Sequence, residues 1–327
     1  MTTRLTATVE RWPIAGAFTI SRGSRTEAVV VVATIQADGL VGRGECVPYP
    51  RYGESVEGVE ALIRDQADAV AAGLTRAELA ARLPAGAARN ALDAALWDLE
   101  AKRAGTRAWD LAGLARPEPV TTCYTLSLGA PEAMEAAARS ASHRPLLKVK
   151  LGGAGDPARI AAVRRGAPDA RLVVDANEAW DAATIEENLA ACAEAGVLLV
   201  EQPLPAKDDA LLARIAHPIP LCADESLHPG ASLDPLVGRY DAVNVKLDKA
   251  GGLTEALALA EAARARGLAV MVGCMVGTSL SMAPATLLSP QAAFVDLDGP
   301  LLLASDRAPC LRYDGSLVHP PEAALWG

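Results

Sequence analysis

Aromatic residues are scarce in this sequence: five tryptophans, five tyrosines and two phenylalanines are spread over 327 residues. Proteins that bind single-stranded nucleic acids stack the bases on aromatic side chains, and proteins that bind a phosphate backbone carry excess positive charge. Here 40 acidic residues outnumber 31 Lys and Arg residues, and the formal net charge is −9. The composition therefore argues against nucleic acid as a partner.

Cysteine pairs and long apolar runs are missing as well. The cysteines form no C-x-x-C pair and are widely separated, at Cys46, Cys123, Cys192, Cys222, Cys274 and Cys310. This pattern is typical of reduced thiols. The first ten residues lack the apolar core of a signal peptide, and no uninterrupted apolar run approaches the ~18 residues that a membrane span needs. We therefore expect a cytoplasmic protein without a membrane partner.

The pattern of strands and helices changes along the chain. Residues 28–35 form an apolar strand pattern, and the turn signal at 38–39 leads into a second strand, which predicts a hairpin. Helical patterns follow over 56–72 and 87–103. Strands followed by a separate group of helices predict an α+β domain.

Short apolar strands then alternate with helices, which is typical of a parallel α/β sheet. Candidate strands lie at 121–128, 146–151, 171–177, 196–202, 219–225, 241–248, 268–274 and 293–298. Helical patterns fall between them at 157–166, 181–195, 207–216 and 253–266. Eight strands favour a closed barrel, and the lack of a glycine fingerprint after the first strand argues against a dinucleotide-binding sheet.

These patterns predict three parts. Residues 1–117 form the α+β domain, residues 118–304 the barrel, and residues 305–327 a segment too short to be a domain. We expect this last segment to pack back on the first domain.

An ionisable residue ends each of five successive candidate strands, namely Lys150, Asp175, Glu201, Asp224 and Lys246. The intervals are 25, 26, 23 and 22 residues (175−150, 201−175, 224−201, 246−224). One strand, one helix and two loops occupy about that length. Because the carboxyl ends of barrel strands form one mouth, where active sites lie, we expect these five side chains around one site.

The three carboxylates indicate a metal site. Asp175, Glu201 and Asp224 have no His or Cys companion, and a site of oxygen ligands suits Mg²⁺. Each carboxylate alone is also compatible with a helix cap or a surface ion pair. Three in phase at strand ends favour the metal.

The lysines indicate proton transfer. Lys148 and Lys150 lie two residues apart on one strand, so both point to the same side. Their mutual repulsion and a nearby divalent cation are expected to lower their pKa, which lets a lysine act as a base. Lys246 enters from the opposite side of the mouth. Two opposed bases can move a proton beside a carboxylate from one face to the other, while Mg²⁺ stabilises the enediolate. Racemases and epimerases need this arrangement.

Five motifs make the sequence resemble the muconate-lactonising branch of the enolase superfamily, in which a Lys base with Mg²⁺ is an established pattern. They are K-V-K (148–150), V-D-A-N (174–177), E-Q-P (201–203), A-D-E-S (223–226) and N-V-K-L-D-K-A-G-G (244–252). The resemblance implies an α/β fold, with an α+β capping domain and a modified (β/α)₇β TIM-like barrel.

The same resemblance assigns roles to residues. It implies that Asp175, Glu201 and Asp224 bind one Mg²⁺ per subunit, and that Lys150 and Lys246 are the acid/base pair. It also places Asn177 and Glu225 in a second layer around the metal site.

Within that branch the sequence is similar to dipeptide epimerases. The motifs are R-G-S-R (22–25), P-Y-P-R-Y-G-E-S (48–55), L-P-A-G-A-A-R-N-A-L-D (83–93) and D-L-D-G-P (296–300). The resemblance implies a dipeptide as the small-molecule partner. It further implies interconversion of L-Ala-L-Glu and L-Ala-D-Glu in murein-peptide recycling, by two-base 1,1-proton transfer at the C-terminal residue.

Residues outside the metal triad are the expected substrate contacts. Asp296 and Asp298 share one face of the eighth strand and are expected to hold the ammonium of the dipeptide, although an acidic turn would have the same sequence. Arg22 or Arg25 is expected to pair with the distal carboxylate, and the choice between them stays open. The remaining expected contacts are Lys148 and Thr125.

Other functions remain open at this level. N-acylamino acid racemase, o-succinylbenzoate synthase and muconate cycloisomerase would use the same lysines and metal, but none needs a cation site on the eighth strand. A Schiff-base barrel aldolase with Lys246 as nucleophile does not need three carboxylates in phase. A non-catalytic binding barrel needs neither lysine. A homo-oligomer is compatible with the sequence.

Overall fold

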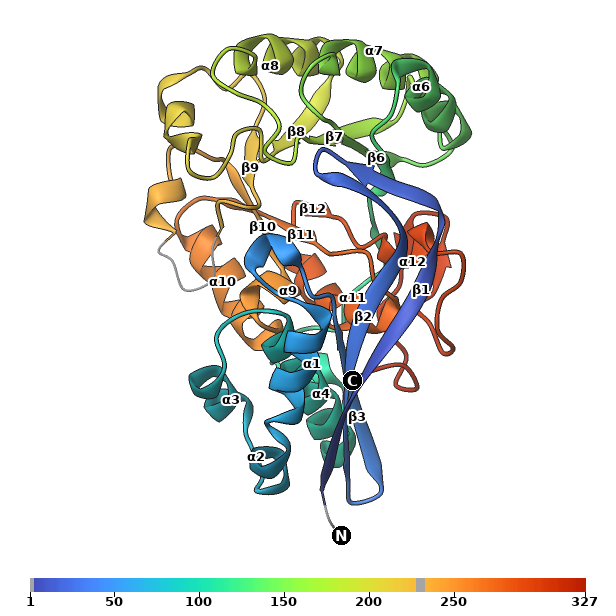
Figure 1. The fold of residues 1–327 in the computed structure, drawn as a ribbon, viewed down its shortest axis with the longest axis vertical. Coiled ribbons are helices and arrows are strands. Elements are labelled where there is room, and N and C mark those ends of the chain that lie inside the picture. The colour runs from blue at the N-terminus through green and yellow to red at the C-terminus, as the bar shows by residue number, and fades with distance from the viewer. Residues whose placement is uncertain (1–2, 228–232) are drawn as a thin grey trace.

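The computed structural model describes residues 3–227 and 233–327. A capping domain lies at one end and an eight-stranded barrel at the other (Figure 1). Among the described residues, no helix is both long and apolar enough to cross a membrane.

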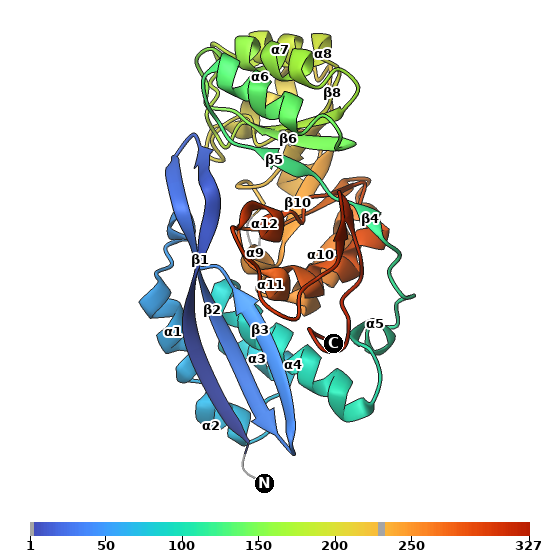
Figure 2. The same ribbon diagram turned by 90° about the vertical axis from the view of Figure 1, so that its right-hand side faces the viewer.

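The capping domain is built on one antiparallel sheet. Its strands are β1 (Arg4–Ile20), β2 (Gly23–Ala37) and β3 (Leu40–Cys46). The predicted β2–β3 hairpin is present, whereas the 17-residue strand β1 was not predicted. The tip of the β1–β2 hairpin leaves the capping helices and reaches the barrel (Figures 1 and 2), where the Leu128 amide donates to the Thr19 carbonyl at 3.0 Å.

The capping helices cover one face of this sheet. They are α1 (Val56–Arg64), α2 (Ala67–Ala71), α3 (Arg76–Arg82), α4 (Ala87–Ala104) and α5 (Ala108–Leu111). The helix predicted over 56–72 is therefore divided, because the backbone turns at Gln66. Helix α4 lies so close to β3 that a Cβ atom at Gly42 or Gly44 would fall within 2.2 Å of an α4 carbonyl oxygen. Glycine is required at both positions.

The second domain is an eight-stranded parallel sheet, and each predicted strand contains one of its members. They are β5 (Tyr124–Leu126), β6 (Leu146–Lys150), β7 (Arg171–Asp175), β8 (Val197–Glu201), β9 (Leu221–Ala223), β10 (Ala242–Lys246), β11 (Ala269–Gly273) and β12 (Phe294–Val295). Hydrogen bonds from Cys123 to Val295 and from Leu297 to Thr122, both 2.8 Å, join the first and last strands. The predicted α/β barrel with an α+β cap is confirmed.

Helical segments connect these strands on the outside. They are α6 (Pro131–Ser140), α7 (Asp156–Gly166), α8 (Ile185–Glu194), the 3-10 helices η2 (Asp209–Arg214) and η3 (Asp234–Leu236), α9 (Leu247–Ala250), α10 (Leu253–Ala265), α11 (Ser279–Ala285) and η4 (Thr286–Gln291). The α-helix predicted over 207–216 was wrong, since this segment forms only η2. Tertiary contacts hold its first turn, where buried Asp209 accepts a hydrogen bond from the Tyr240 hydroxyl at 3.1 Å.

The C-terminal segment touches both domains. Its strands β13 (Tyr313–Asp314) and β14 (Leu317–Val318) pair with β4 (Val120–Thr121) at the start of the barrel. Its last residues reach the cap, where the Trp326 indole donates to the Ala94 carbonyl at 3.0 Å and the Gly327 amide donates to Asp98 at 2.7 Å. The C-terminal segment therefore packs on the barrel as well as on the cap, and the division into residues 1–117, 118–304 and 305–327 stays a proposal.

Candidate active site

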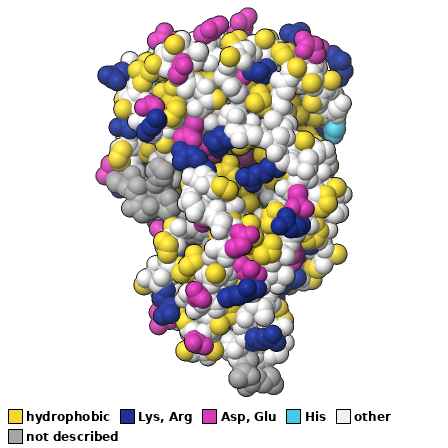
Figure 3. Space-filling model, in the orientation of Figure 1, with side chains coloured by type: hydrophobic (Ala, Val, Ile, Leu, Met, Phe, Trp, Pro, Cys, Tyr) yellow, Lys and Arg dark blue, Asp and Glu magenta, His cyan; other side chains and the backbone are white. Residues whose placement is uncertain are grey.

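A cavity of about 210 Å³ lies where the barrel strands end beneath the β1–β2 hairpin. In the space-filling view, basic side chains border a hollow on this face (Figure 3). Ten of the thirteen predicted site residues line the cavity: Arg22, Arg25, Thr125, Lys150, Asn177, Asp224, Glu225, Lys246, Asp296 and Asp298. The other three, Lys148, Asp175 and Glu201, are fully buried, and each contacts a lining residue.

The two predicted bases enter this cavity from β6 and β10, which β7, β8 and β9 separate in the sheet. Lys150 Nζ lies 2.6 Å from Asp175 Oδ2, and these residues are direct partners in the β6–β7 ladder. Lys246 Nζ lies 2.6 Å from Asp224 Oδ2 and 3.8 Å from Glu201 Oε1. Each ammonium group therefore sits between the cavity and the carboxylates.

Lys148 lies among three carboxylates. Its Nζ is 2.6 Å from Glu201 Oε2, 2.7 Å from Asp296 Oδ2 and 3.5 Å from Asp175 Oδ2. Burial alone would lower the pKa of Lys148, but these carboxylates raise it well above its ordinary value. The predicted lowering of the Lys148 pKa by its neighbour Lys150 is therefore wrong. The spacing along one strand reveals the like charge of Lys150, but not the carboxylates that other strands bring within 2.7 Å of Lys148 Nζ.

The pKa of Lys246 is shifted in the same direction. Burial opposes the shift, but Asp224 and Glu201 raise this pKa well above the ordinary value. The same attraction holds the pKa of Asp224 well below its usual range despite burial, through Lys246 and Lys249.

The three predicted metal ligands come from the ends of adjacent strands. Burial would raise the pKa of Asp175, but Lys150 and Lys148 lower it to about 2. Burial raises the pKa of Glu201, and repulsion by Asp175 adds to it. The Glu201 Oε2 atom is buried and has no hydrogen bond, although the Lys148 ammonium is near.

This donor set fits Mg²⁺ in its chemistry. It offers only carboxylate oxygens, from three neighbouring strands, with one buried oxygen that lacks a hydrogen bond. Within residues 3–227 and 233–327, no three acidic, Cys or His side chains converge as metal ligands do. Instead, the carboxylates pair with the lysine ammonium groups. These groups supply positive charge next to the carboxylates, as a bound divalent cation would.

The acid pair after β12 faces the cavity. Asp298 Oδ2 accepts a hydrogen bond from the Thr125 amide at 2.6 Å, so Thr125 contributes its backbone here. Burial and repulsion by Asp296 raise the pKa of Asp298 to about 7. Asp296 Oδ1 is buried without a hydrogen-bond partner. A ligand with hydrogen-bond donors can satisfy this atom.

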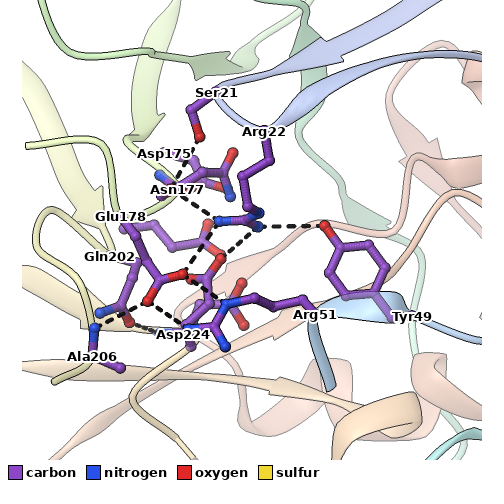
Figure 4. A network of polar contacts seen from close by, with 12 residues as sticks. Ser21, Arg22, Tyr49, Arg51, Asp175, Asn177, Glu178, Gln202, Ala206 and Asp224 are labelled. Carbon is purple, nitrogen blue, oxygen red and sulfur yellow. Dashed lines mark hydrogen bonds and ion pairs between the residues drawn. The ribbon is translucent and has the colours of Figure 1, made fainter. Parts of the chain in front are cut away.

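The two loop arginines differ in their partners. Arg22 donates to Glu225 Oε1 at 2.8 Å, to the Asn177 carbonyl at 2.9 Å and to the Tyr49 hydroxyl at 3.3 Å (Figure 4). Arg25 is exposed and its guanidinium lies 5.4 Å from the centre of the Tyr49 ring. Among the described residues the Arg25 guanidinium has no hydrogen bond or ion pair, so its donors are available to a ligand.

The second-layer residues lie at a strained turn and at the end of β9. Asn177 has a φ of +46° and its amide donates to Asp175 Oδ1 at 2.9 Å. Glu225 is buried, and burial together with repulsion by Asp224 raises its pKa to about 7, against the attraction of Lys246 and Arg22.

Four further residues of the site were not predicted. Lys249 donates to the Asp224 side chain and carbonyl at 2.5 and 2.6 Å, and Gln202 accepts from the Asp224 amide at 2.9 Å. Arg51 binds Glu178 through two hydrogen bonds of 3.0 and 2.8 Å. Arg51, Lys249 and Gln202 lie inside the quoted motifs, so their positions were a usable signal.

Two family models match the chain. Residues 132–321 match a domain described as enolase C-terminal domain-like, and residues 2–113 match the N-terminal domain of mandelate racemase / muconate lactonizing enzyme.

Two curated proteins are similar over almost the whole chain. The L-Ala-D/L-Glu epimerase of Escherichia coli (strain K12) is 50% identical over 95% of this chain and 97% of its own length. The N-acetyl-D-glutamate racemase of Pseudoalteromonas sp is 44% identical over 91% of this chain and 95% of its own.

Solved structures have the same fold. An enolase family member from Agrobacterium tumefaciens, with homology to dipeptide epimerases and with bound sodium and L-Ala-L-Glu, is 56% identical, with a TM-score of 0.97 over 99% of this chain and 100% of its own. The dipeptide epimerase from Enterococcus faecalis V583 was solved with Mg and L-Leu-L-Tyr. It is 28% identical, with a TM-score of 0.91 over 99% of each chain.

Proposed function

The chain belongs to the mandelate racemase / muconate lactonizing enzyme group of the enolase superfamily, and from this we propose that it interconverts L-Ala-L-Glu and L-Ala-D-Glu. It is an isomerase, and its substrates are dipeptides. The reacting atom in the proposed reaction is the α-carbon of the C-terminal residue.

One observation carries the proposed mechanism. Lys150 and Lys246 line one cavity from strands that three other strands separate, and no other described lysine lines that cavity. Two bases on opposite sides of a carbon can exchange its proton between faces. A single nucleophilic lysine, as in a Schiff-base aldolase, would need no such partner.

In this mechanism one lysine removes the α-proton from its own face of the α-carbon, and the ammonium group of the other lysine donates a proton to the opposite face. Lys150 serves one face through β6, and Lys246 serves the other through β10. Asp175 and Asp224 hold the two ammonium groups in place at 2.6 Å. Both carboxylates also orient the lysines toward the cavity.

We propose that Asp175, Glu201 and Asp224 hold one Mg²⁺ per subunit. Bound there, Mg²⁺ supplies positive charge beside the substrate carboxylate, which stabilises the negative charge that develops when the α-proton leaves. Lys148, predicted as a substrate contact, neutralises Glu201 and Asp296 from behind the cavity. Asn177 and Glu225 support the site from the second layer.

The strand-eight carboxylates and the loop arginine would fix the two ends of the dipeptide. The ammonium group would bind at Asp296 Oδ1 and at Asp298, where the Thr125 amide holds the other carboxylate oxygen. The distal carboxylate of Glu would bind Arg25, whose donors have no protein partner among the described residues. Arg22 would instead hold its loop closed.

The second candidate is racemisation of an N-acylated glutamate, which the 44% identity to the Pseudoalteromonas sp racemase favours. An N-acyl group carries no positive charge, so it would leave the acid pair at 296 and 298 without a cation. The dipeptide therefore fits the site better. We also propose that the enzyme works in the cytoplasm, in murein-peptide recycling, and its free cysteines are compatible with this.

Isotope exchange tests the proposal directly. The enzyme with Mg²⁺ is incubated in D₂O with L-Ala-L-Glu, L-Ala-D-Glu or N-acetyl-L-glutamate, and α-deuterium is read by mass spectrometry. We expect exchange and inversion at the Glu residue of both dipeptides, and loss of both in EDTA. Exchange of N-acetylglutamate alone would contradict the dipeptide assignment, and full activity in EDTA would contradict the metal.

A further inference from the structure

The short helix α9 follows the base Lys246 directly, and all four of its residues are buried. Asp248, in its first turn, is only 8% exposed. The Oδ1 atom of Asp248 accepts hydrogen bonds from the Asn90 side-chain amide at 2.8 Å and from the Val47 backbone amide at 3.0 Å. Asn90 belongs to α4, and Val47 follows β3 and lines the cavity. One buried carboxylate therefore joins two segments of the cap to the helix that begins after Lys246.

Helix α4 also holds the other end of α9. The buried Arg89 guanidinium donates to the Ala250 carbonyl at 2.7 Å and to the Gly251 carbonyl at 3.1 Å. The two elements pack so closely that a Cβ atom at Gly251 would lie 2.3 Å from the Arg89 side chain. Adjacent residues of α4, Arg89 and Asn90, thus bind both ends of α9, and a shift of α9 would break hydrogen bonds to the cap.

The chain after the other base is anchored differently. The Gly153 amide, which follows Lys150 by three residues, donates to Asp156 at 2.7 Å, and Asp156 belongs to the barrel helix α7. The cap reaches Lys150 at its side chain, where the centre of the Phe18 ring lies 5.8 Å from Nζ. The backbone after Lys150 is therefore anchored on the barrel, whereas the backbone after Lys246 is anchored on the cap.

We propose that Asp248 is a positioning residue, through which the cap holds the Lys246 ammonium group in place for proton transfer. This rests on the proposed function, because it takes the two-base reaction from it. Asp248 does not line the cavity and acts only through α9. A base must lie within hydrogen-bond reach of its proton, and a displacement of about 1 Å can lower a rate about 10²-fold. Loss of the Asp248 contacts should therefore slow proton transfer at the face served by Lys246 more than at the face served by Lys150.

Isotope exchange separates the two faces. The initial rate of α-deuterium incorporation is measured with Mg²⁺ in D₂O for L-Ala-L-Glu and for L-Ala-D-Glu, and the ratio of the two rates is compared among variants. Lys246→Ala identifies the isomer that Lys246 deprotonates. We expect Asp248→Ala to lower the exchange of this isomer about tenfold or more relative to the other isomer.

Two further variants of this contact complete the series. Asp248→Asn keeps an acceptor oxygen for Asn90 and Val47, so its ratio should stay near that of the wild type. Asn90→Ala removes one of the two donors to Asp248 and should change the ratio less, but in the same direction as Asp248→Ala. It keeps the test informative if Asp248→Ala does not fold.

Asp98→Ala is the matched control for the loss of a buried carboxylate. Asp98 also lies on α4 and accepts a backbone amide of β3, from Arg43 at 2.8 Å, but its other backbone partner is the Gly327 amide at 2.7 Å and not α9. This variant should leave the ratio unchanged, even if it lowers both rates.

The outcomes distinguish the positioning role from the proposed function. The positioning role is overturned by an unchanged ratio in folded Asp248→Ala, or in Asn90→Ala if Asp248→Ala does not fold. It is also overturned if Asp248→Asn or Asp98→Ala changes the ratio as much as Asp248→Ala does. In each of these cases exchange of both isomers by the wild type leaves the proposed function standing. A wild type that exchanges neither dipeptide contradicts the proposed function instead.

Discussion

At the scale of single residues, Lys150 and Lys246 have separate stereochemical tasks in the proposed mechanism. Removing one lysine should lower epimerisation about 10²- to 10⁴-fold, the usual contribution of a positioned acid or base. The remaining lysine still reaches the α-proton of one isomer. Lys150→Ala and Lys246→Ala should therefore each retain solvent exchange with one dipeptide isomer, and with opposite isomers, as α-deuterium mass spectrometry will show.

Lys207→Ala is the control for this experiment, because its side chain is 84% exposed. It should keep both exchange and epimerisation. Loss of exchange with both isomers in each active-site variant would show that the lysines do not act on separate faces.

The two loop arginines are expected to differ in what they recognise. Arg25 has free donors at the cavity, whereas Arg22 is bonded to Glu225, Asn177 and Tyr49. A hydrogen bond between charged groups contributes about 1.5–3 kcal/mol. Arg25→Met should therefore lower kcat/KM for Ala-Glu about 10- to 100-fold relative to Ala-Gln.

Arg22→Met should affect both dipeptides alike, because Arg22 holds the loop. The measurement is the ratio of kcat/KM for Ala-Glu and Ala-Gln in each variant. If Arg22→Met changes this ratio and Arg25→Met does not, the assignment of the two arginines is reversed.

At the scale of elements, the barrel strands could be predicted because each is an apolar run that ends in an ionisable residue. That pattern also predicts the regular spacing of five ionisable residues, one at each strand end, and their side chains meet at one site. These residues are Lys150, Asp175, Glu201, Asp224 and Lys246. The pairing of each lysine with a carboxylate could not be predicted, because it depends on distances across strands. The raised pKa of Lys148 follows from those distances.

Other elements depend on contacts that the local sequence does not encode. Strand β1 contains Pro13 and a shift of register between Pro13 and Phe18, which interrupts its alternation. Asn177, Glu178 and Gln202 have positive φ angles, which tertiary contacts impose on residues other than glycine. These turns place Glu178 and Gln202 in the site, and the spacing of ionisable residues at strand ends predicts neither position.

Glu178 ties two capping loops to the barrel. It accepts two hydrogen bonds from Arg51, lies 3.5 Å from Arg22, and accepts from the Ala206 amide at 3.0 Å (Figure 4). Glu178→Gln should weaken these contacts and disfavour the closed loops. We expect KM for Ala-Glu to rise about tenfold, as loss of one charged hydrogen bond allows, with kcat changed less.

Glu135→Gln is a matched control, because Glu135 on the outer helices also accepts two hydrogen bonds from one arginine, Arg165, at 3.1 and 2.8 Å, although both go to its Oε2 atom. It should leave the KM unchanged. Equal values of KM in wild type and Glu178→Gln would show that the loops close without this contact.

At the scale of the whole molecule, the cap and the barrel are joined through buried polar groups. Arg307 of the C-terminal segment binds Glu10 of β1 and Glu45 of β3 at 2.8 and 2.6 Å. Asp93 of α4 accepts hydrogen bonds from the Thr254 amide and hydroxyl at 3.0 and 2.6 Å, at the start of α10. The cavity lies between these two domains, so its shape depends on how firmly they are joined.

The Asp93 contact should make stability depend on pH. Burial raises the pKa of Asp93 from 3.8 to about 6, and the Thr254 hydrogen bonds offset only part of this. Between these values the folded chain binds more protons than the unfolded chain, so this contribution to stability is complete below pH 3.8 and is lost as the pH rises through about 6. The difference corresponds to about 3 kcal/mol.

Asp93→Asn removes the titration and keeps one acceptor for Thr254. As the pH rises, the free energy of unfolding of the variant should therefore increase relative to that of the wild type. Urea unfolding at pH 4.5 and pH 7.5 gives the difference between variant and wild type at each pH. Any cost of the altered hydrogen bond is common to both pH values and cancels in the comparison. A difference that is the same at the two pH values would show that Asp93 is ionised in the folded protein throughout this range, and that the joint between α4 and α10 holds a charged carboxylate.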